Sequence, residues 1–146
     1  MATRNPRTGS PSDASAVTDA ELARRAAEAF KSAYSPYSNI RVGAALLATD
    51  GRVFTGCNVE NASFGMTVCA ERTAVLKAVS EGAREFTAIA LATDHEHPLM
   101  PCGACRQVLF EFAPRLRVLV IGPDGTRRET ILDALLPDAF GPLDMR

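Results

Sequence analysis

The amino-acid sequence predicts an α/β fold in which helices flank a mixed β-sheet. Strand-like and helix-like segments alternate along most of the chain. Residues 86–94 form a continuous apolar run, as in a central strand that is buried on both faces. Two further apolar runs flank Asp50–Gly51, a dipeptide that favours a hairpin turn. The chain has 146 residues, 47% of them hydrophobic, which is enough for one compact core.

The chain is expected to begin with a tail. Residues 1–17 are rich in small and polar side chains and contain almost no large apolar ones. Burial therefore cannot offset the entropy lost on ordering them. We predict that residues 1–17 are disordered and that residues 18–146 form the folded domain.

The first helix is predicted to begin after Thr18. Glu21 follows three residues later, and this pair fits a capping box. Apolar residues then recur at the spacing of one helical face, at Leu22, Ala26 and Phe30. Pro36 is expected to stop the helix, because proline disfavours helical geometry in the residue before it.

The remaining elements follow from apolar runs and turn residues. The hairpin occupies residues 40–60, and Gly82 is expected to close the helix after it. The later segments are, in order, a helix at 69–82, a strand at 86–94, a helix at 103–113, a strand at 116–122, a turn at 123–126 and a short closing helix at 131–141. This pattern contains four strands.

Composition excludes several classes of function. The net charge of −1 gives no global field that would recruit nucleic acid or an anionic membrane. The sequence contains no apolar run of membrane-spanning length and no apolar signal segment at its start, so we expect a cytoplasmic protein. In that reducing compartment, its cysteines indicate metal or redox chemistry more than structural disulfides. They are Cys57, Cys69, Cys102 and Cys105.

Three cysteines and a glutamate lie at the starts of two predicted helices. Cys102 and Cys105 form a Cys-x-x-Cys pair, and Cys69 could add a third sulfur to the same metal ion. Helix dipoles would help to keep these sulfurs ionised if both helices start at one point. Three thiolates on Zn²⁺ leave the fourth tetrahedral position open for water, which is typical of a catalytic site. Glu71 is close enough in sequence to shuttle protons without being a ligand.

The charge of this site predicts a role for Arg72. Zinc lowers the pKa of a bound water towards roughly 7. Three thiolates on one dication carry a net negative charge, which works against that effect. A compensating cation is therefore expected nearby, and Arg72 is the candidate. The alternative interpretation is a surface salt bridge.

Two other interpretations of the cysteines are open. Cys102 and Cys105 could be a redox dithiol, although the preceding proline and the lack of a thioredoxin-like context argue against it. A closed structural zinc site would need a fourth protein ligand. The candidates for that ligand are Cys57, His95 and His97.

The sequence resembles a known family. Cys-Ala-Glu at residues 69–71, followed by Pro-Cys-Gly-Ala-Cys at residues 101–105, matches the zinc deaminase signature in its three-cysteine form. Together with residues 35–79 and 135–142, these motifs resemble a cytidine deaminase of the small, homotetrameric type, from about Thr18 to the C-terminus. The resemblance implies the three-layer fold of that family with a five-stranded mixed sheet. It also implies one Zn²⁺ per subunit and active sites shared between subunits.

The resemblance further implies an activity. Cytidine and 2′-deoxycytidine would be hydrolysed to uridine and 2′-deoxyuridine with release of ammonia, as in pyrimidine salvage. Cys69, Cys102 and Cys105 would be the zinc ligands. Glu71 would carry protons from water to N3 and then to the leaving amino group, while the backbone N–H of Ala70 would bind the pyrimidine O2.

Residues outside the zinc motif are implicated by the same resemblance. Asn58 and Glu60 would hold the ribose 3′-hydroxyl, and an amide and a carboxylate can serve one hydroxyl as donor and acceptor. Phe140 would reach into a neighbouring subunit and pack on the base, and Phe64 would lie near the subunit contacts. Ile40 stands where many relatives have phenylalanine, so it offers apolar contact without ring stacking.

Two alternative functions are kept. A related deaminase acting on blasticidin S shares the zinc motif, although Asn58, Glu60 and Phe140 favour a plain nucleoside. A zinc-stabilised binding module without catalysis would have a closed four-ligand site and no need of Glu71. A polynucleotide substrate is disfavoured, because the chain has no tryptophan, only two tyrosines and no positive net charge.

Overall fold

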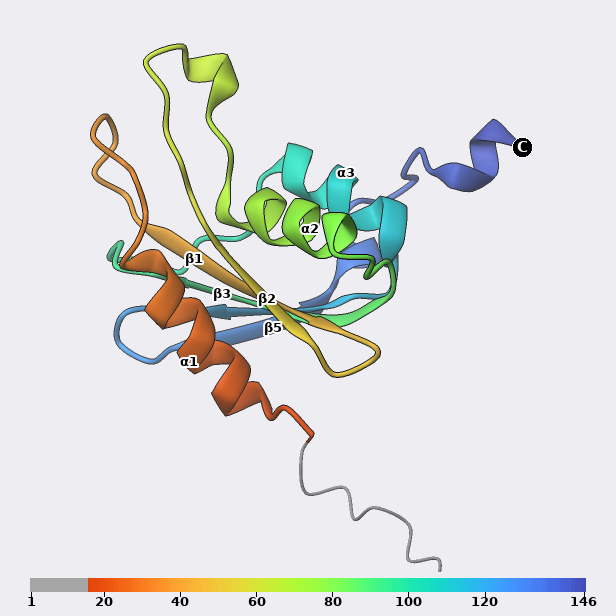
Figure 1. The fold of residues 1–146 in the computed structure, drawn as a ribbon, viewed down its shortest axis with the longest axis horizontal. Coiled ribbons are helices and arrows are strands. Elements are labelled where there is room, and N and C mark those ends of the chain that lie inside the picture. Colours follow the sequence, from red (N-terminus) through yellow and green to blue (C-terminus); the bar gives the residue numbers. More distant parts are fainter. Residues whose placement is uncertain (1–15) are drawn as a thin grey trace, which may run out of the picture.

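The computed structural model describes residues 16–146, which form a five-stranded mixed sheet in the order β2-β1-β3-β4-β5 (Figure 1). The helices and strands are α1 (Asp19–Phe30), β1 (Val42–Ala48), β2 (Val53–Cys57), α2 (Ala70–Ser80), β3 (Phe86–Thr93), α3 (Gly103–Phe112), β4 (Arg117–Ile121) and β5 (Arg127–Ile131). Strands β3 and β4 are parallel, and the other neighbours are antiparallel. The predicted α/β fold class is confirmed. Most of the predicted tail, residues 1–15, lies outside the described residues.

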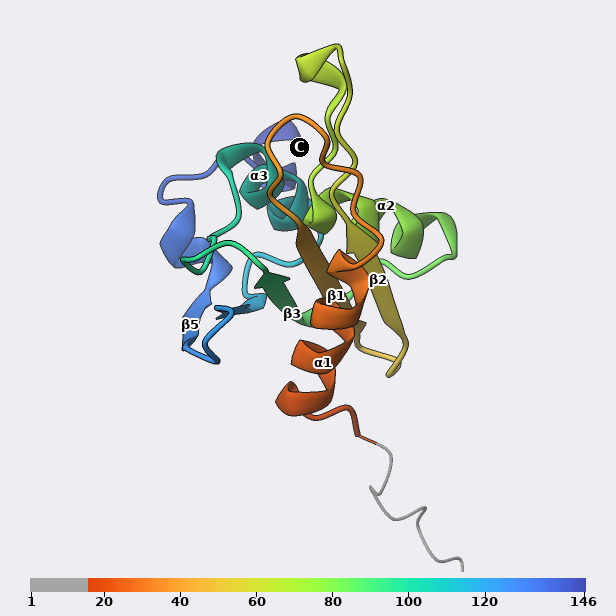
Figure 2. The ribbon, with the colours of Figure 1, turned by 90° about the vertical axis from the view of Figure 1, so that its left-hand side faces the viewer.

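The sheet is the middle of three layers. Helix α1 covers one face, and α2 and α3 cover the other (Figures 1 and 2). Strand β3 contributes side chains to the hydrophobic cores on both faces of the sheet, because successive side chains of a strand point to opposite faces. Its larger residues Ile89 and Leu91 pack on the α2/α3 side, whereas alanines such as Ala90 pack on the α1 side. No helix within residues 16–146 combines the length and apolar character needed to cross a membrane.

Two glycines let helices approach the sheet closely. A Cβ added to Gly43 in β1 would lie 2.0 Å from the Ala26 carbonyl oxygen of α1. A Cβ added to Gly56 in β2 would lie 2.5 Å from the Ala70 carbonyl oxygen of α2. Both distances are far shorter than a van der Waals contact, and the atoms concerned are backbone atoms that cannot move freely. Only glycine therefore fits at these two positions. Gly56 thus fixes the first turn of α2 against the sheet.

The start of α1 agrees with its prediction only in part. The Thr18 side-chain oxygen accepts a hydrogen bond from the backbone N–H of Glu21 at 3.1 Å, as predicted for the N-cap. The reciprocal half of the capping box is replaced, because the Glu21 carboxylate accepts hydrogen bonds from Arg24 and Arg25 instead. The helix ends at Phe30, before the predicted stop at Pro36.

The predicted closing helix at 131–141 is wrong. Ile131 ends β5, and within residues 131–141 only a 3-10 turn, η2 (Leu132–Leu135), follows. Pro137 cannot lie inside a continuous helix, and Asp138 has a left-handed φ of 51°. Strand β5 was missing from the residue pattern because it is an edge strand of mostly exposed polar residues, without apolar alternation.

Candidate active site

Three thiols meet where α2 and α3 begin. Cys69 is the N-cap residue of α2, Cys102 is the N-cap residue of α3, and Cys105 lies in the first turn of α3. Their sulfur atoms all lie within 4.8 Å of one another, and those of Cys69 and Cys102 are 3.9 Å apart. Within residues 16–146, this is the one group of three or more potential ligands close enough to share a metal ion.

The backbone before each helix is fixed by hydrogen bonds. Val59 and Val68 exchange N–H···O bonds of 2.9 and 3.0 Å just before Cys69. On the other side, Arg106 Nε donates to the carbonyl oxygen of Pro101 at 2.7 Å, directly before Cys102. Neither N-cap cysteine makes a side-chain capping bond to its helix in this part of the chain, so both sulfurs are available to a ligand.

The thiols of Cys69 and Cys105 affect each other's ionisation. A hydrogen bond from the Cys105 thiol, aided by the Arg72 guanidinium, lowers the pKa of Cys69 to about 5. The same contact and burial raise the pKa of Cys105 above its ordinary value. One sulfur is therefore readily ionised and its neighbour holds a proton, which a divalent cation would displace. Three soft sulfur donors in this arrangement suit Zn²⁺.

Glu71 lies beside the thiols in the first turn of α2. Its side chain is buried, with 5% of the residue exposed. Burial raises the pKa of this carboxyl to about 7, and the negative charge of Cys69 acts in the same direction. A carboxyl group that titrates near neutrality is suited to accept and return a proton during catalysis.

Arg72 lies against the thiol cluster. Its Nη2 atom is 3.3 Å from the sulfur of Cys69 and 3.4 Å from the carbonyl oxygen of Thr67. The contact with Cys69 raises the pKa of the guanidinium further, so the group stays charged. Arg72 makes no ion pair with a carboxylate among residues 16–146, which argues against the surface salt-bridge alternative.

A pocket of about 170 Å³ opens over these groups. Its wall consists of Val42, Asn58, Thr67, Cys69, Ala70, Glu71, Leu99, Met100 and Cys102. A second pocket of about 390 Å³ shares Thr67 with the first and is lined also by Tyr37, Ser38, Glu60 and Phe64. The predicted site residues Asn58, Ala70 and Glu71 thus lie in one pocket, and Glu60 lies in the adjoining one.

The two predicted sugar-binding residues have partners within the chain. The Asn58 amide accepts from the N–H of Val42 and donates to the carbonyl oxygen of Ile40, both at 2.8 Å. This pairing links the end of β2 to the start of β1. The Glu60 carboxylate accepts from the N–H groups of Tyr37 and Ser38 at 2.9 and 3.1 Å, and from the Ser38 hydroxyl at 2.6 Å.

Two predicted substrate contacts do not line the thiol pocket of their own chain. Ile40 is half-buried next to Asn58. Phe140 is 61% exposed, and its carbonyl oxygen accepts a hydrogen bond from Gln107 at 2.9 Å. Sequence reasoning also missed Thr67, whose place between the two pockets depends on loop geometry that no local pattern encodes.

The candidates for a fourth protein ligand lie outside the cluster. Cys57 ends β2, and His95 and His97 lie in the loop after β3 with their rings 5.9 Å apart. None of them belongs to the group of sulfurs in the described part of the chain. The structure therefore supplies three ligands, as an open catalytic site requires.

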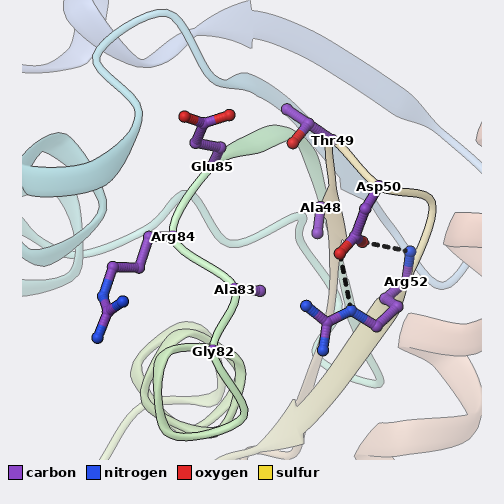
Figure 3. Close-up of a pocket in the computed structure, with 8 residues that line it drawn as sticks. All are labelled: Ala48, Thr49, Asp50, Arg52, Gly82, Ala83, Arg84 and Glu85. Atoms are coloured by element: carbon purple, nitrogen blue, oxygen red, sulfur yellow. Dashed lines mark hydrogen bonds and ion pairs between the residues drawn. The ribbon is translucent and has the colours of Figure 1, made fainter.

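A separate pocket, of about 250 Å³, lies at the other end of α2, around the β1–β2 turn (Figure 3). Arg52 Nε donates to Asp50 at 2.9 Å and its Nη1 donates to the Glu81 carbonyl oxygen at 3.1 Å, so this guanidinium is engaged within the chain. Figure 3 shows Arg84 extending away from Arg52. No cysteine or histidine lines this pocket.

The chain is similar to known proteins. The model of the cytidine and deoxycytidylate deaminase zinc-binding region matches residues 16–121. The cytidine deaminase of Sporosarcina psychrophila is 48% identical over 126 residues, covering 86% of this chain and 93% of its own length. That of Halalkalibacterium halodurans is 50% identical over 125 residues, covering 85% and 95%.

Solved structures of cytidine deaminases are also similar to this chain. Cytidine deaminase from Burkholderia pseudomallei is 50% identical, with a TM-score of 0.81 over 84% of this chain and 99% of that chain. The enzyme from Mycobacterium tuberculosis is 48% identical, with a TM-score of 0.72 over 82% and 94%. The match covers most of the chain, including the three thiols and the buried glutamate, and it shows that the chain belongs to the cytidine and deoxycytidylate deaminase family.

Proposed function

We propose that the domain at residues 18–146 hydrolyses cytidine and 2′-deoxycytidine to uridine and 2′-deoxyuridine, with release of ammonia. Cys69, Cys102 and Cys105 would hold one Zn²⁺ per subunit. The observation that carries this proposal is the meeting of three sulfurs within 4.8 Å beside a buried carboxyl group. The identity with named cytidine deaminases over most of the chain supports it.

The chain's own residues account for the proton transfers. Bound zinc would supply Lewis acidity that activates a water for attack on C4 of the base. Glu71 takes the proton of that water, delivers it to N3 and later assists departure of the amino group. Its raised pKa of about 7 means that gaining and losing a proton cost similar free energy at neutral pH. The charged Arg72 offsets the excess negative charge of three thiolates.

Substrate recognition uses the pocket walls. The N–H of Ala70, in the first turn of α2, would bind the pyrimidine O2, since helix-start amides have no partner in their own helix. Asn58 and Glu60 bind the ribose 3′-hydroxyl with the hydrogen-bonding capacity that their contacts within the chain leave free. Ile40 gives the nucleoside an apolar neighbour.

We also propose a homotetramer with shared active sites. Two segments project from the body, the arm around η1 (Phe64–Met66) and the C-terminal segment (Figure 1). Both carry exposed apolar side chains, namely Phe64, Met66, Phe140, Leu143 and Met145. Such exposure is typical of an interface. Phe140 would then complete the pocket of a neighbouring subunit. Pyrimidine salvage in the cytoplasm fits the reaction and the four free cysteines.

The first test is an ultraviolet assay of purified protein with cytidine, with uridine and ammonia identified as products. We expect turnover that disappears when zinc is stripped and returns when zinc is added. Turnover of blasticidin S in place of cytidine would favour the alternative deaminase. A zinc-loaded protein that turns over neither substrate nor 2′-deoxycytidine would favour the non-catalytic module.

A further inference from the structure

The loop before β1 is built around the Ser38 side chain. The Ser38 hydroxyl donates to Glu60 Oε2 at 2.6 Å and accepts from the N–H of Ile40 at 3.0 Å. Asn39 between them has a left-handed φ of 59°, a conformation that asparagine tolerates better than most residues. One small side chain therefore joins two residues with proposed roles in nucleoside binding.

Ser38 supplies two of the three hydrogen bonds that the Glu60 carboxylate accepts within the chain. A carboxylate can accept about four hydrogen bonds. Three are already used, by the N–H of Tyr37 and by the N–H and the hydroxyl of Ser38. One acceptor position remains for a substrate hydroxyl, and the contacts with Ser38 determine where it points. The 2.6 Å bond to the hydroxyl has the length of a strong, charge-assisted hydrogen bond.

The same serine is linked to the other sugar-binding residue. Ile40, held by Ser38 through its N–H, accepts a hydrogen bond from the Asn58 amide through its carbonyl oxygen. Asn58 lines the thiol pocket, and Ser38 and Glu60 line the adjoining pocket, with Thr67 in both walls. The chain of contacts Glu60–Ser38–Ile40–Asn58 therefore runs from one pocket to the other.

We infer that Ser38 is a positioning residue that sets the selectivity for substrates with a 3′-hydroxyl, by holding Glu60 and, through Ile40, Asn58 in register for that group. This inference rests on the proposed nucleoside deamination. Ser38 takes no part in the chemistry at C4, so it governs how the sugar is bound and leaves proton transfer by Glu71 unchanged.

The test compares three substrates in one set of variants. Cytidine and 2′-deoxycytidine carry the 3′-hydroxyl, and 3′-deoxycytidine lacks it. For Ser38→Ala, we expect kcat/KM to fall about tenfold with the first two substrates, mainly through KM, which corresponds to about 1.4 kcal/mol. We expect little change with 3′-deoxycytidine, because Glu60 then has no substrate hydroxyl to bind.

Matched variants separate positioning from loop structure. Ser38→Thr keeps a hydroxyl and should retain most of the wild-type kcat/KM. Ser38→Val, whose side chain has the shape of threonine without the hydroxyl, should not. This pair also serves if Ser38→Ala does not fold. Ser35→Ala, in the same loop, is the control, since the Ser35 hydroxyl makes no contact with Glu60 in the described structure. In a Glu60→Gln background, Ser38→Ala should have a much smaller effect.

The outcomes of these experiments distinguish the positioning role of Ser38 from the proposed function. An equal loss on all three substrates, or no loss on any, would overturn the positioning role while leaving the proposed function intact. A full effect of Ser38→Ala in the Glu60→Gln background would overturn the route through Glu60. A wild-type protein that turns over no cytidine with zinc bound would overturn the proposed function and the inference with it.

Discussion

The two ends of α2 carry pockets of opposite character. The pocket at its start has a volume of about 170 Å³ and contains Cys69, Cys102 and the buried Glu71. The pocket at its end is larger, about 250 Å³, and is lined by residues of the β1–β2 turn and the α2–β3 connection (Figure 3). Between these two pockets, volume alone would favour the one at the end of α2 as a functional site.

The chemistry of the groups reverses that ranking. At the end of α2, Arg52 is satisfied by Asp50 and by a backbone carbonyl. The hydrogen bonds from Arg52 hold the pKa of Asp50 below its ordinary value, as in an ordinary surface pair. At the start of α2, the Cys105 thiol and the Arg72 guanidinium lower the pKa of Cys69 to about 5, and burial raises the pKa of Glu71 to about 7. These are the directions that metal binding and proton transfer need. Convergent ionisable groups with displaced pKa values mark the site better than volume does.

The largest effect on zinc content and turnover is expected from loss of a sulfur ligand. Cys105→Ser should reduce bound zinc to a small fraction of one ion per chain, with loss of nearly all cytidine turnover, because two thiolates hold zinc far less tightly than three. Zinc analysis by atomic absorption and the deamination assay would measure both. The matched control is Cys57→Ser, since Cys57 lies outside the sulfur cluster. Full zinc and turnover in the Cys105 variant would refute the ligand assignment.

A smaller effect is expected at Arg72. Replacing Arg72 by Gln removes the cation that contacts Cys69 at 3.3 Å. Loss of such an outer partner typically costs about 10–100-fold in metal affinity or activity. Competition with a zinc chelator and kcat/KM for cytidine would measure the change. The zinc affinity and kcat/KM of Arg72→Lys should fall between those of the wild type and Arg72→Gln, because lysine keeps the charge but not the guanidinium geometry. Wild-type values in the glutamine variant would show that the cation is not needed.

The smallest effect is predicted for the other end of the helix. Arg52→Gln should leave kcat and KM for cytidine unchanged and lower the unfolding midpoint by less than about 3 °C, because exposed ion pairs contribute little. The stabilising contribution of Asp50, whose pKa lies below its ordinary value, should be present above that value and fade as pH falls below it. Thermal unfolding at several pH values would measure this. A clear loss of turnover would mean that the pocket at the end of α2 also serves the reaction.

The start of α2 could be predicted from the sequence because its signals are local. The spacing of Cys102 and Cys105 and the proximity of Cys69 and Glu71 are readable along the chain, and the fold then brings the two helix starts together. Strand β5 could not be found that way, because an exposed edge strand has no apolar period. The contact of Ser38 with Glu60 joins residues 22 apart and depends on loop geometry. The role proposed for Phe140 requires a neighbouring chain, which a pattern within one sequence does not describe.

In the proposed reaction, the buried carboxyl group at the start of α2 moves protons while the sulfurs hold the metal. Glu71→Gln tests it most directly, because the change keeps the shape of the side chain and removes its ability to accept a proton. Zinc content and cytidine turnover should be measured on the same preparation. We predict that Glu71→Gln binds as much zinc as the wild type and that its kcat is lower by about 10²–10⁴-fold. Turnover close to that of the wild type, with zinc bound, would contradict the mechanism.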